Sequence, residues 1–250
     1  MPKTTTQTAT AFAAVASLWP LLFVPLTLMA VLSFGHDGGN LLLGALFIYL
    51  FVRHADLKTR RLMIVLAVFS GLFETANVAS GAYEYFGTLG SPLWISLGWA
   101  IMGWWVVHIL PLARRVPFKA AYAVAAGAIV AAAYLNGTLS LTTPIALAGL
   151  YALSLAVTQP FAIYAFTALF AIVAEFSGTF SGVWGYFNFD GYPMPPDLAM
   201  LALVYPTVMA FSFWASGFEG HAENQGQAAP MPLKAKQAQV SAKRAAKKRN

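Results

Sequence analysis

Cysteine is absent from this sequence, and charged side chains are scarce. Without cysteine the chain can form no disulfide, iron–sulfur cluster or thiolate metal site. Only 10% of the 250 residues are charged and 59% are hydrophobic, whereas soluble domains carry about 25% charged residues. The four histidines have no metal-ligand spacing, and the sequence motifs for phosphate binding, dinucleotide binding and Ser-His-Asp catalysis are missing. We therefore expect neither a metal nor a cofactor.

Long apolar runs take the place of the missing charges. A run of about twenty residues is long enough to cross the hydrocarbon core of a bilayer as a helix. The sequence therefore predicts a polytopic, all-α membrane protein. We expect about eight transmembrane helices, near residues 12–34, 41–52, 62–80, 93–110, 120–135, 141–157, 161–177 and 198–216. The second run is the shortest, so the count of eight rests on the charges between the runs.

The fifteen lysine and arginine residues distinguish eight spans from seven. With eight spans all fifteen fall on one side of the membrane, whereas seven would put one basic cluster on the other side. Basic residues accumulate on the cytoplasmic side. The pattern predicts a protein of the cell inner (plasma) membrane with both termini in the cytoplasm. The net charge of +6 belongs to these loops and to a disordered basic tail over residues 218–250, so it does not indicate a nucleic-acid partner.

A segment that runs from a glutamate to a proline occurs twice, about one hundred residues apart. Residues 74–92 and 175–193 align without a gap and share seven identities in nineteen positions, where about one or two are expected from composition. The identical pairs are Glu74/Glu175, Ser80/Ser181, Gly81/Gly182, Tyr85/Tyr186, Phe86/Phe187, Gly90/Gly191 and Pro92/Pro193. Such self-similarity predicts a duplicated unit. Because four spans return the chain to its starting side, we expect two parallel four-helix repeats, over residues 1–112 and 113–217.

Glu74 and Glu175 stand inside apolar runs at the start of the two copies. An ionisable side chain within a membrane helix is costly, and it normally faces the bundle interior or an aqueous cavity. The outer halves of the predicted spans contain no lysine or arginine, and burial without a countercharge favours the neutral carboxylic acid. We interpret both glutamates as candidate catalytic acids. The alternative is a structural role, a hydrogen bond that holds the two halves together.

Aromatic residues crowd the segments that follow the two glutamates. Their π-faces favour contact with an apolar ligand or with a developing cation, although an interfacial aromatic belt also accounts for them. Asn77 lies one turn after Glu74, within reach of a hydrogen bond to it. The candidate substrate-binding residues are Asn77, Tyr83, Tyr85, Trp99, Trp184 and Tyr186.

The first copy reads E-x6-G-x-Y-x-Y-x4-G-x-P from Glu74 to Pro92, with Trp99 beyond it. In this pattern it resembles the bacterioruberin-type carotenoid hydratases, polytopic proteins of carotenoid biosynthesis with an intramembrane glutamate ahead of a G-x-Y-x-Y segment. The resemblance covers about thirty residues of the first copy, and the second copy departs from it with Trp184 in place of Tyr83. It implies addition of water to a terminal isoprenoid double bond, with Glu74 as the proton donor and an aromatic pocket around the substrate.

Three functions remain open at this point. The leading hypothesis is an integral membrane enzyme that uses carboxylic-acid catalysis on a hydrophobic, isoprenoid or carotenoid-like molecule. A proton-coupled transporter is the first alternative, because parallel repeats with intramembrane acids suit alternating access. The second alternative is a non-catalytic scaffold or sensor subunit that uses its basic tail as a contact point. The expected partners are membrane lipid and a hydrophobic small molecule.

Overall fold

Helices make up most of the protein in a computed structural model, which describes residues 23–188 and 190–218. The helices are α2 (Phe23–Arg53), α3 (Leu57–Ala79), α4 (Leu93–Ala113), α5 (Phe118–Leu135), α6 (Thr142–Ala156), α7 (Phe161–Phe180) and α8 (Leu198–Ala215). The strands are β1 (Tyr83–Tyr85), β2 (Trp184–Phe187) and β3 (Pro193–Met194). The start of the first predicted span and the basic tail from residue 219 lie outside the described residues.

Six of the seven helices in the described residues are long and apolar enough to cross a membrane, and α6, with 15 residues, is shorter. Many large apolar side chains on these helices are exposed, including Leu135, Phe180 and Trp214 at 79%, 85% and 76%. A soluble protein rarely leaves so many large apolar side chains in water, whereas lipid tails solvate them. The structure thus agrees with the predicted class of helical membrane protein.

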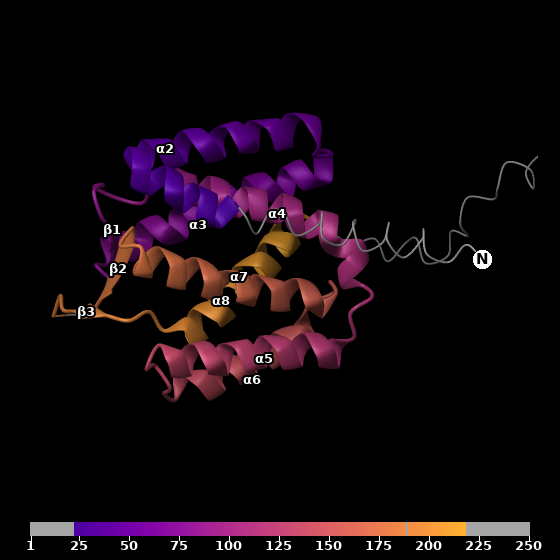
Figure 1. The fold of residues 1–250 in the computed structure, drawn as a ribbon. Helices are drawn as coiled ribbons and strands as arrows, with labels where there is room; N and C mark the ends of the chain where they lie inside the picture. The colour runs from indigo at the N-terminus through magenta and orange to yellow at the C-terminus, as the bar shows by residue number, and fades with distance from the viewer. Residues whose placement is uncertain (1–22, 189, 219–250) are drawn as a thin grey trace, which may run out of the picture. The chain divides into compact units, whose positions relative to one another are not determined.

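Helix α2 folds back on itself at Gly35 (Figure 1). This residue has φ 67° and ψ −171°, a conformation that glycine adopts without steric cost. A Cβ atom on Gly38 would lie 2.7 Å from the carbonyl oxygen of Ala30, although eight residues of an uninterrupted helix span about 12 Å. The two arms of α2 are therefore in contact. The sequence predicted two spans separated by residues 35–40, whereas in the structure the second arm begins directly after Gly35.

A small antiparallel sheet, which the all-α prediction did not contain, lies at one end of the helices (Figure 1). Strand β1 pairs with β2, and β2 pairs with β3. The facing residues of the first pair are Tyr83/Tyr186, Glu84/Gly185 and Tyr85/Trp184. Aromatic side chains favour strands, and pairing satisfies backbone groups that would otherwise lack partners. Strands of two to four residues are too short for their periodicity to be recognised in the sequence.

The two helices that carry the glutamates end in the same way. After Ser80 and Ser181, the chain passes through Gly81 and Gly182 at φ 75° and 69°. Each glycine N–H donates to the carbonyl three residues back, and the following N–H donates to the carbonyl five residues back. This pair of hydrogen bonds is the Schellman motif. Both helices therefore release the chain with the same local geometry, and a strand follows each of them.

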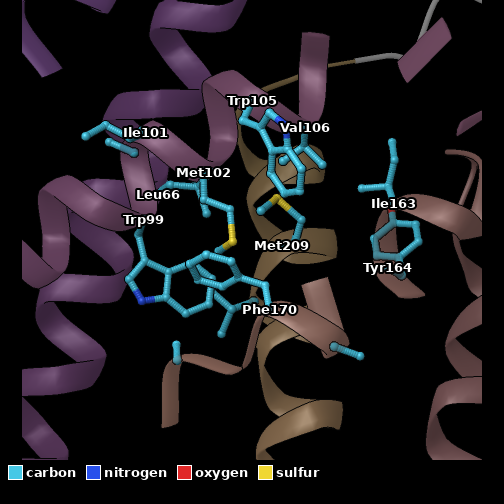
Figure 2. Packing of buried hydrophobic residues seen from close by; sticks show 14 of the residues in the cluster. Leu66, Trp99, Ile101, Met102, Trp105, Val106, Ile163, Tyr164, Phe170 and Met209 are labelled. Carbon is cyan, nitrogen blue, oxygen red and sulfur yellow. The ribbon is translucent and has the colours of Figure 1, made fainter. Parts of the chain in front are cut away.

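The core lies between α3, α4, α7 and α8, and α4 and α7 are the most deeply buried helices. Figure 2 shows Leu66, Trp99, Tyr164 and Met209, one from each of these helices, among the buried residues. Helix α2 packs on α4, α5 packs on α7, and α6 packs on α8. The helices that carry Glu74 and Glu175, α3 and α7, thus belong to the central group, where side chains that point inward are shielded from lipid.

We expect Gly35→Ala to lower the stability of the fold. No atom lies within 4 Å of the added Cβ, so the loss arises from the backbone alone. The combination of φ 67° with ψ −171° is almost restricted to glycine, and another residue adopts it at a cost of about 1–3 kcal/mol. Gly44→Ala is the matched control, because its Cβ meets only Leu97 at 3.9 Å. Thermal unfolding in detergent measures both variants, and an equal melting temperature for the two would contradict the turn at Gly35.

Candidate functional site

Glu74 of α3 and Glu175 of α7 line the same cavity, and each side chain is only 5% exposed. The cavity measures about 70 Å³. Because a water molecule needs roughly 10–15 Å³ of such space, it has room for several waters or for a small apolar group. The aromatic part of its wall consists of Tyr85, Trp94, Trp99, Phe170, Trp184 and Tyr205. No lysine or arginine occurs among the described residues of the wall.

Three side chains donate hydrogen bonds to the carboxyl group of Glu175. The Tyr186 hydroxyl lies 2.6 Å from Oε2, and the Trp184 indole Nε1 lies 3.0 Å from the same oxygen. The Tyr205 hydroxyl donates to Oε1. The donors come from β2 and from α8, so the sheet and the last helix together fix this carboxyl group.

Glu74 has a sparser set of neighbours. The Tyr85 hydroxyl donates to its Oε2 at 3.2 Å, and the Trp99 side chain is a further hydrogen-bonding neighbour. Tyr85 occupies the place in β1 that Tyr186 occupies in β2, eleven residues after its glutamate in both cases. The aligned positions of the two copies therefore make the same type of contact, at different lengths.

The strand geometry explains why the tyrosines reach inward. Successive side chains of a strand point to opposite faces, so Tyr83 and Tyr85 are buried while Glu84 between them is exposed. The helix ends described above bring the strand over the glutamate of its own copy. The exposed Glu84 is thus an acid outside the cavity, in a strand that contributes directly to it.

Aromatic rings enclose the two acids. Tyr85 contacts Trp94 and Trp184 edge-on, with ring centroids 6.2 and 5.8 Å apart. Trp99 and Tyr205 lie closer, at 4.6 Å. Faces of Trp and Tyr rings attract positive charge. The site therefore combines a pair of carboxyl groups with surfaces that stabilise a cation.

His36, directly after the turn in α2, connects this helix to the aromatic wall. The Trp94 indole N–H donates to His36 Nδ1 at 3.2 Å, and His36 Nε2 lies 2.7 Å from the carbonyl oxygen of Phe86. Because an indole nitrogen only donates and a carbonyl only accepts, these partners assign the neutral tautomer with its proton on Nε2. The side-chain oxygen Oδ1 of Asn40 accepts a further hydrogen bond, from the backbone N–H of Trp94 at 2.8 Å.

The hydroxyls of the two strand tyrosines are held in their protonated form. Burial, followed by the charges of Glu74 and Glu175, holds the pKa of Tyr85 well above its usual range. Burial, followed by the charge of Glu175, does the same to the pKa of Tyr186. Both phenols therefore remain hydrogen-bond donors at neutral pH, and neither is a candidate base.

The structure brings most of the predicted site residues together. Tyr85, Trp99 and Trp184 line the cavity, and Tyr186 contacts Glu175. Tyr83 is not part of the wall, although its ring lies 5.2 Å from that of Tyr186.

Asn77 does not make the contact that its spacing predicted. Its Nδ2 donates to the carbonyl oxygen of Phe73, 3.0 Å away in the same helix, and the side chain does not line the cavity. Asn77 lies three residues after Glu74, so the two side chains are offset around the helix axis. The amide of Asn77 instead donates its hydrogen bond to a backbone carbonyl of its own helix. The expected Asn77–Glu74 hydrogen bond is therefore wrong.

Sequence reasoning missed Tyr205 and His36 as parts of the site. The repeat offset of 101 residues aligns Tyr205 with Trp104. An aromatic residue at the same position of both copies was the sequence feature that could have identified Tyr205. A tyrosine hydroxyl within an apolar helix also needs a hydrogen-bond partner. His36 lies near Trp94 only because α2 folds back at Gly35. The spacing of the two residues in the sequence does not predict this contact.

No group of three metal-ligating side chains occurs in the described part of the chain. No family model, curated protein or solved structure matches this chain. Because function belongs to the chemistry of a site rather than to its fold, the two acids and their aromatic wall carry the functional argument.

We expect Gly178→Ala to disrupt the site. A Cβ on Gly178 would lie 1.9 Å from Cζ2 of Trp184, so the indole must leave its place beside Glu175. Overpacking of this kind costs about 1–3 kcal/mol, which thermal unfolding with tryptophan fluorescence detects. Gly127→Ala is the control, because no atom lies within 4 Å of its Cβ and alanine favours the helix. Equal stability and fluorescence in both variants would contradict this packing.

Proposed function

We propose that this protein is an integral membrane enzyme that protonates a carbon–carbon double bond of an isoprenoid or carotenoid-like substrate and adds water to it. One observation carries the proposal: Glu74 and Glu175 share a buried cavity with aromatic walls. An apolar substrate enters such a site from the bilayer without losing favourable hydration. The carboxyl groups supply the proton that an alkene needs, and the ring faces favour the carbocation that results.

The reaction conserves its atoms within the cavity. A neutral glutamic acid gives its proton to the less substituted carbon of the terminal double bond. The π electrons form the new C–H bond there and leave a tertiary carbocation on the other alkene carbon. A cavity water then forms a C–O bond to the cation and passes a proton to the carboxylate, which restores the acid. The net change is the addition of one water molecule across the double bond, and the space of about 70 Å³ admits that water.

The resemblance to bacterioruberin-type carotenoid hydratases supports the choice of substrate. Three of the residues that carry this resemblance, Glu74, Tyr85 and Trp99, line the cavity, whereas Tyr83 lies outside its wall. In the second copy Trp184 replaces Tyr83 and donates to Glu175. The position at which the second copy departs from the motif is thus one whose side chain, Trp184, contacts Glu175 directly.

We further propose that the chain forms eight spans in two parallel repeats of four. The two arms of α2 support this count, since they match α5 and α6 at the repeat offset. The strand pairing supports a twofold relation, because Tyr83 faces Tyr186 and Tyr85 faces Trp184. An offset of 101 residues exchanges these two pairs. A twofold axis along the membrane normal, passing between Glu84 and Gly185, would exchange the two pairs in this way.

The strand end of the bundle is proposed to face away from the cytoplasm. All described lysine and arginine residues lie in or beside the α2–α3 and α4–α5 connections, which Figure 1 shows at the opposite end from the strands. Basic residues mark the cytoplasmic side. We propose on this basis that both termini lie in the cytoplasm and that the protein belongs to the cell inner membrane.

A proton-coupled transporter is the second candidate. Two acids in one hydrogen-bonded cavity resemble the proton relays of pumps and transporters. Against it, α3 and α7 run through Glu74 and Glu175 without a break, whereas many transporters bind at discontinuous helices. Proton flux into proteoliposomes, abolished by Glu→Gln variants and not accompanied by hydration, would favour the transporter.

We expect Glu74→Gln to lower the hydration rate by about 100-fold or more, the usual effect of removing a general acid. The assay follows incorporation of heavy oxygen from labelled water into an acyclic carotene by mass spectrometry. Glu84→Gln is the matched control, because it makes the same change at an exposed position of β1. Full activity of both Glu74→Gln and Glu175→Gln would overturn the proposed function.

The span count is tested with single cysteines, since the natural chain has none. A membrane-impermeant maleimide should label Asp37→Cys and Leu89→Cys in intact cells, and Arg115→Cys only after lysis. Asp37 follows the turn in α2, so it reaches the outer surface only if the two arms are separate spans. Protection of Asp37→Cys together with labelling of Leu89→Cys would contradict eight spans.

A further inference from the structure

We propose that the two glutamates have unequal roles: Glu74 is the proton donor, and Glu175 is an ionised carboxylate that stabilises the carbocation. The use of these charges rests on the proposed function. The difference between the two carboxyl groups rests on their hydrogen bonds alone, and it is measurable without any substrate.

The donors around Glu175 fit an ionised group. A carboxylate is an acceptor only, and Trp184, Tyr186 and Tyr205 all direct a hydrogen at its oxygens. The indole nitrogen of Trp184 cannot accept a hydrogen bond, so the proton in its contact with Glu175 must come from the indole. Within the described part of the chain, neither phenol has another hydrogen-bond partner. A proton on Glu175 would therefore turn one of these hydroxyls away from its only acceptor.

Glu74 is the carboxyl group that holds the proton. It has two hydrogen-bonding neighbours, Tyr85 at 3.2 Å and Trp99, against three for Glu175. Two negative charges in one low-dielectric cavity also repel each other strongly. Like charges in a shared site are relieved when one carboxyl group takes the proton. The group with fewer donors loses less by becoming neutral. The geometry thus assigns the acid to Glu74 and the anion to Glu175.

Two substitutions between the copies produce this difference. Position 83 is tyrosine in the first copy, whereas the matching residue, Trp184, donates to its glutamate. Trp184 fits because the position that matches Asn77 is Gly178, and any larger side chain there would collide with the indole. The second change places Tyr205 where the first copy has Trp104. The second copy therefore carries a more complete set of donors.

The unequal pair suits the proposed chemistry. The Glu74 carboxyl group forms the C–H bond by giving up its proton, and it recovers a proton from the water that captures the cation. Glu175 stays ionised and forms no covalent bond, and its negative charge offsets the positive charge that develops on the substrate. Tyr205 is a positioning residue for Glu175, since it holds Oε1 while the other two donors hold Oε2.

Infrared difference spectroscopy of the full-length protein in lipid nanodiscs at neutral pH tests the assignment. We expect a protonated-carboxyl C=O band in the natural protein, its loss in Glu74→Gln and its retention in Glu175→Gln. Glu84→Gln should keep the band, as the exposed control. Loss in Glu175→Gln with retention in Glu74→Gln, or no such band in the natural protein, would overturn the assignment.

Tyr205→Phe gives a second, independent readout. The ring can stay packed on Trp99, while the donor to Glu175 is lost. We expect a shifted carboxylate band and a hydration rate about 10- to 100-fold lower, as for the loss of a hydrogen bond to a charged group. Tyr122→Phe is the control, because it removes a phenol hydrogen bond to Leu147 outside the cavity. An unchanged carboxylate band in Tyr205→Phe would contradict the positioning role.

The two sets of results separate the two proposals. Infrared bands as expected, without hydration activity in the natural protein, would leave the unequal glutamates standing and reject the enzyme. Hydration that depends on both glutamates, with the C=O band assigned to Glu175, would support the enzyme and reverse the roles.

Discussion

Two carboxyl groups buried in one cavity, with no described cation on its wall, impose the constraint on which this structure depends. A buried polar group without partners costs several kcal/mol in an apolar environment. Lysine or arginine would satisfy the acids but would also neutralise them. Here the partners are phenols and indoles, which donate hydrogen bonds to Glu74 and Glu175 without bringing a positive charge into the cavity.

This choice of partners explains the small sheet. Donors carried only on α3 and α7 would have to reach back along their own helices, as Asn77 does toward the backbone. The Schellman ends turn the chain into strands, and the alternation of the strands sends Tyr85 and Tyr186 back to the acids. Pairing of β1 with β2 then joins the two halves directly over the cavity. The strands therefore form one wall of the cavity, through Tyr85 and Trp184.

Differences between the copies matter as much as their likeness. The likeness gives each acid a tyrosine eleven residues later, and the two carboxyl groups enter one cavity from α3 and α7. Trp184 and Tyr205 then add donors on one side only. A symmetric pair would share its proton equally, whereas unequal donors allow one group to hold the proton and the other to hold the charge.

The sequence by itself determined the helical membrane class, most helix positions and the two acids, because these follow from apolar run length and from the cost of charge in lipid. Only the tertiary structure decided that Glu74 and Glu175 share one cavity, since no local pattern reports a contact between residues a hundred positions apart. It likewise placed His36 beside Trp94 through the reversal at Gly35, and it removed Asn77 from the site. Run length fixes which segments are buried, but side-chain direction and long-range packing fix which polar groups meet.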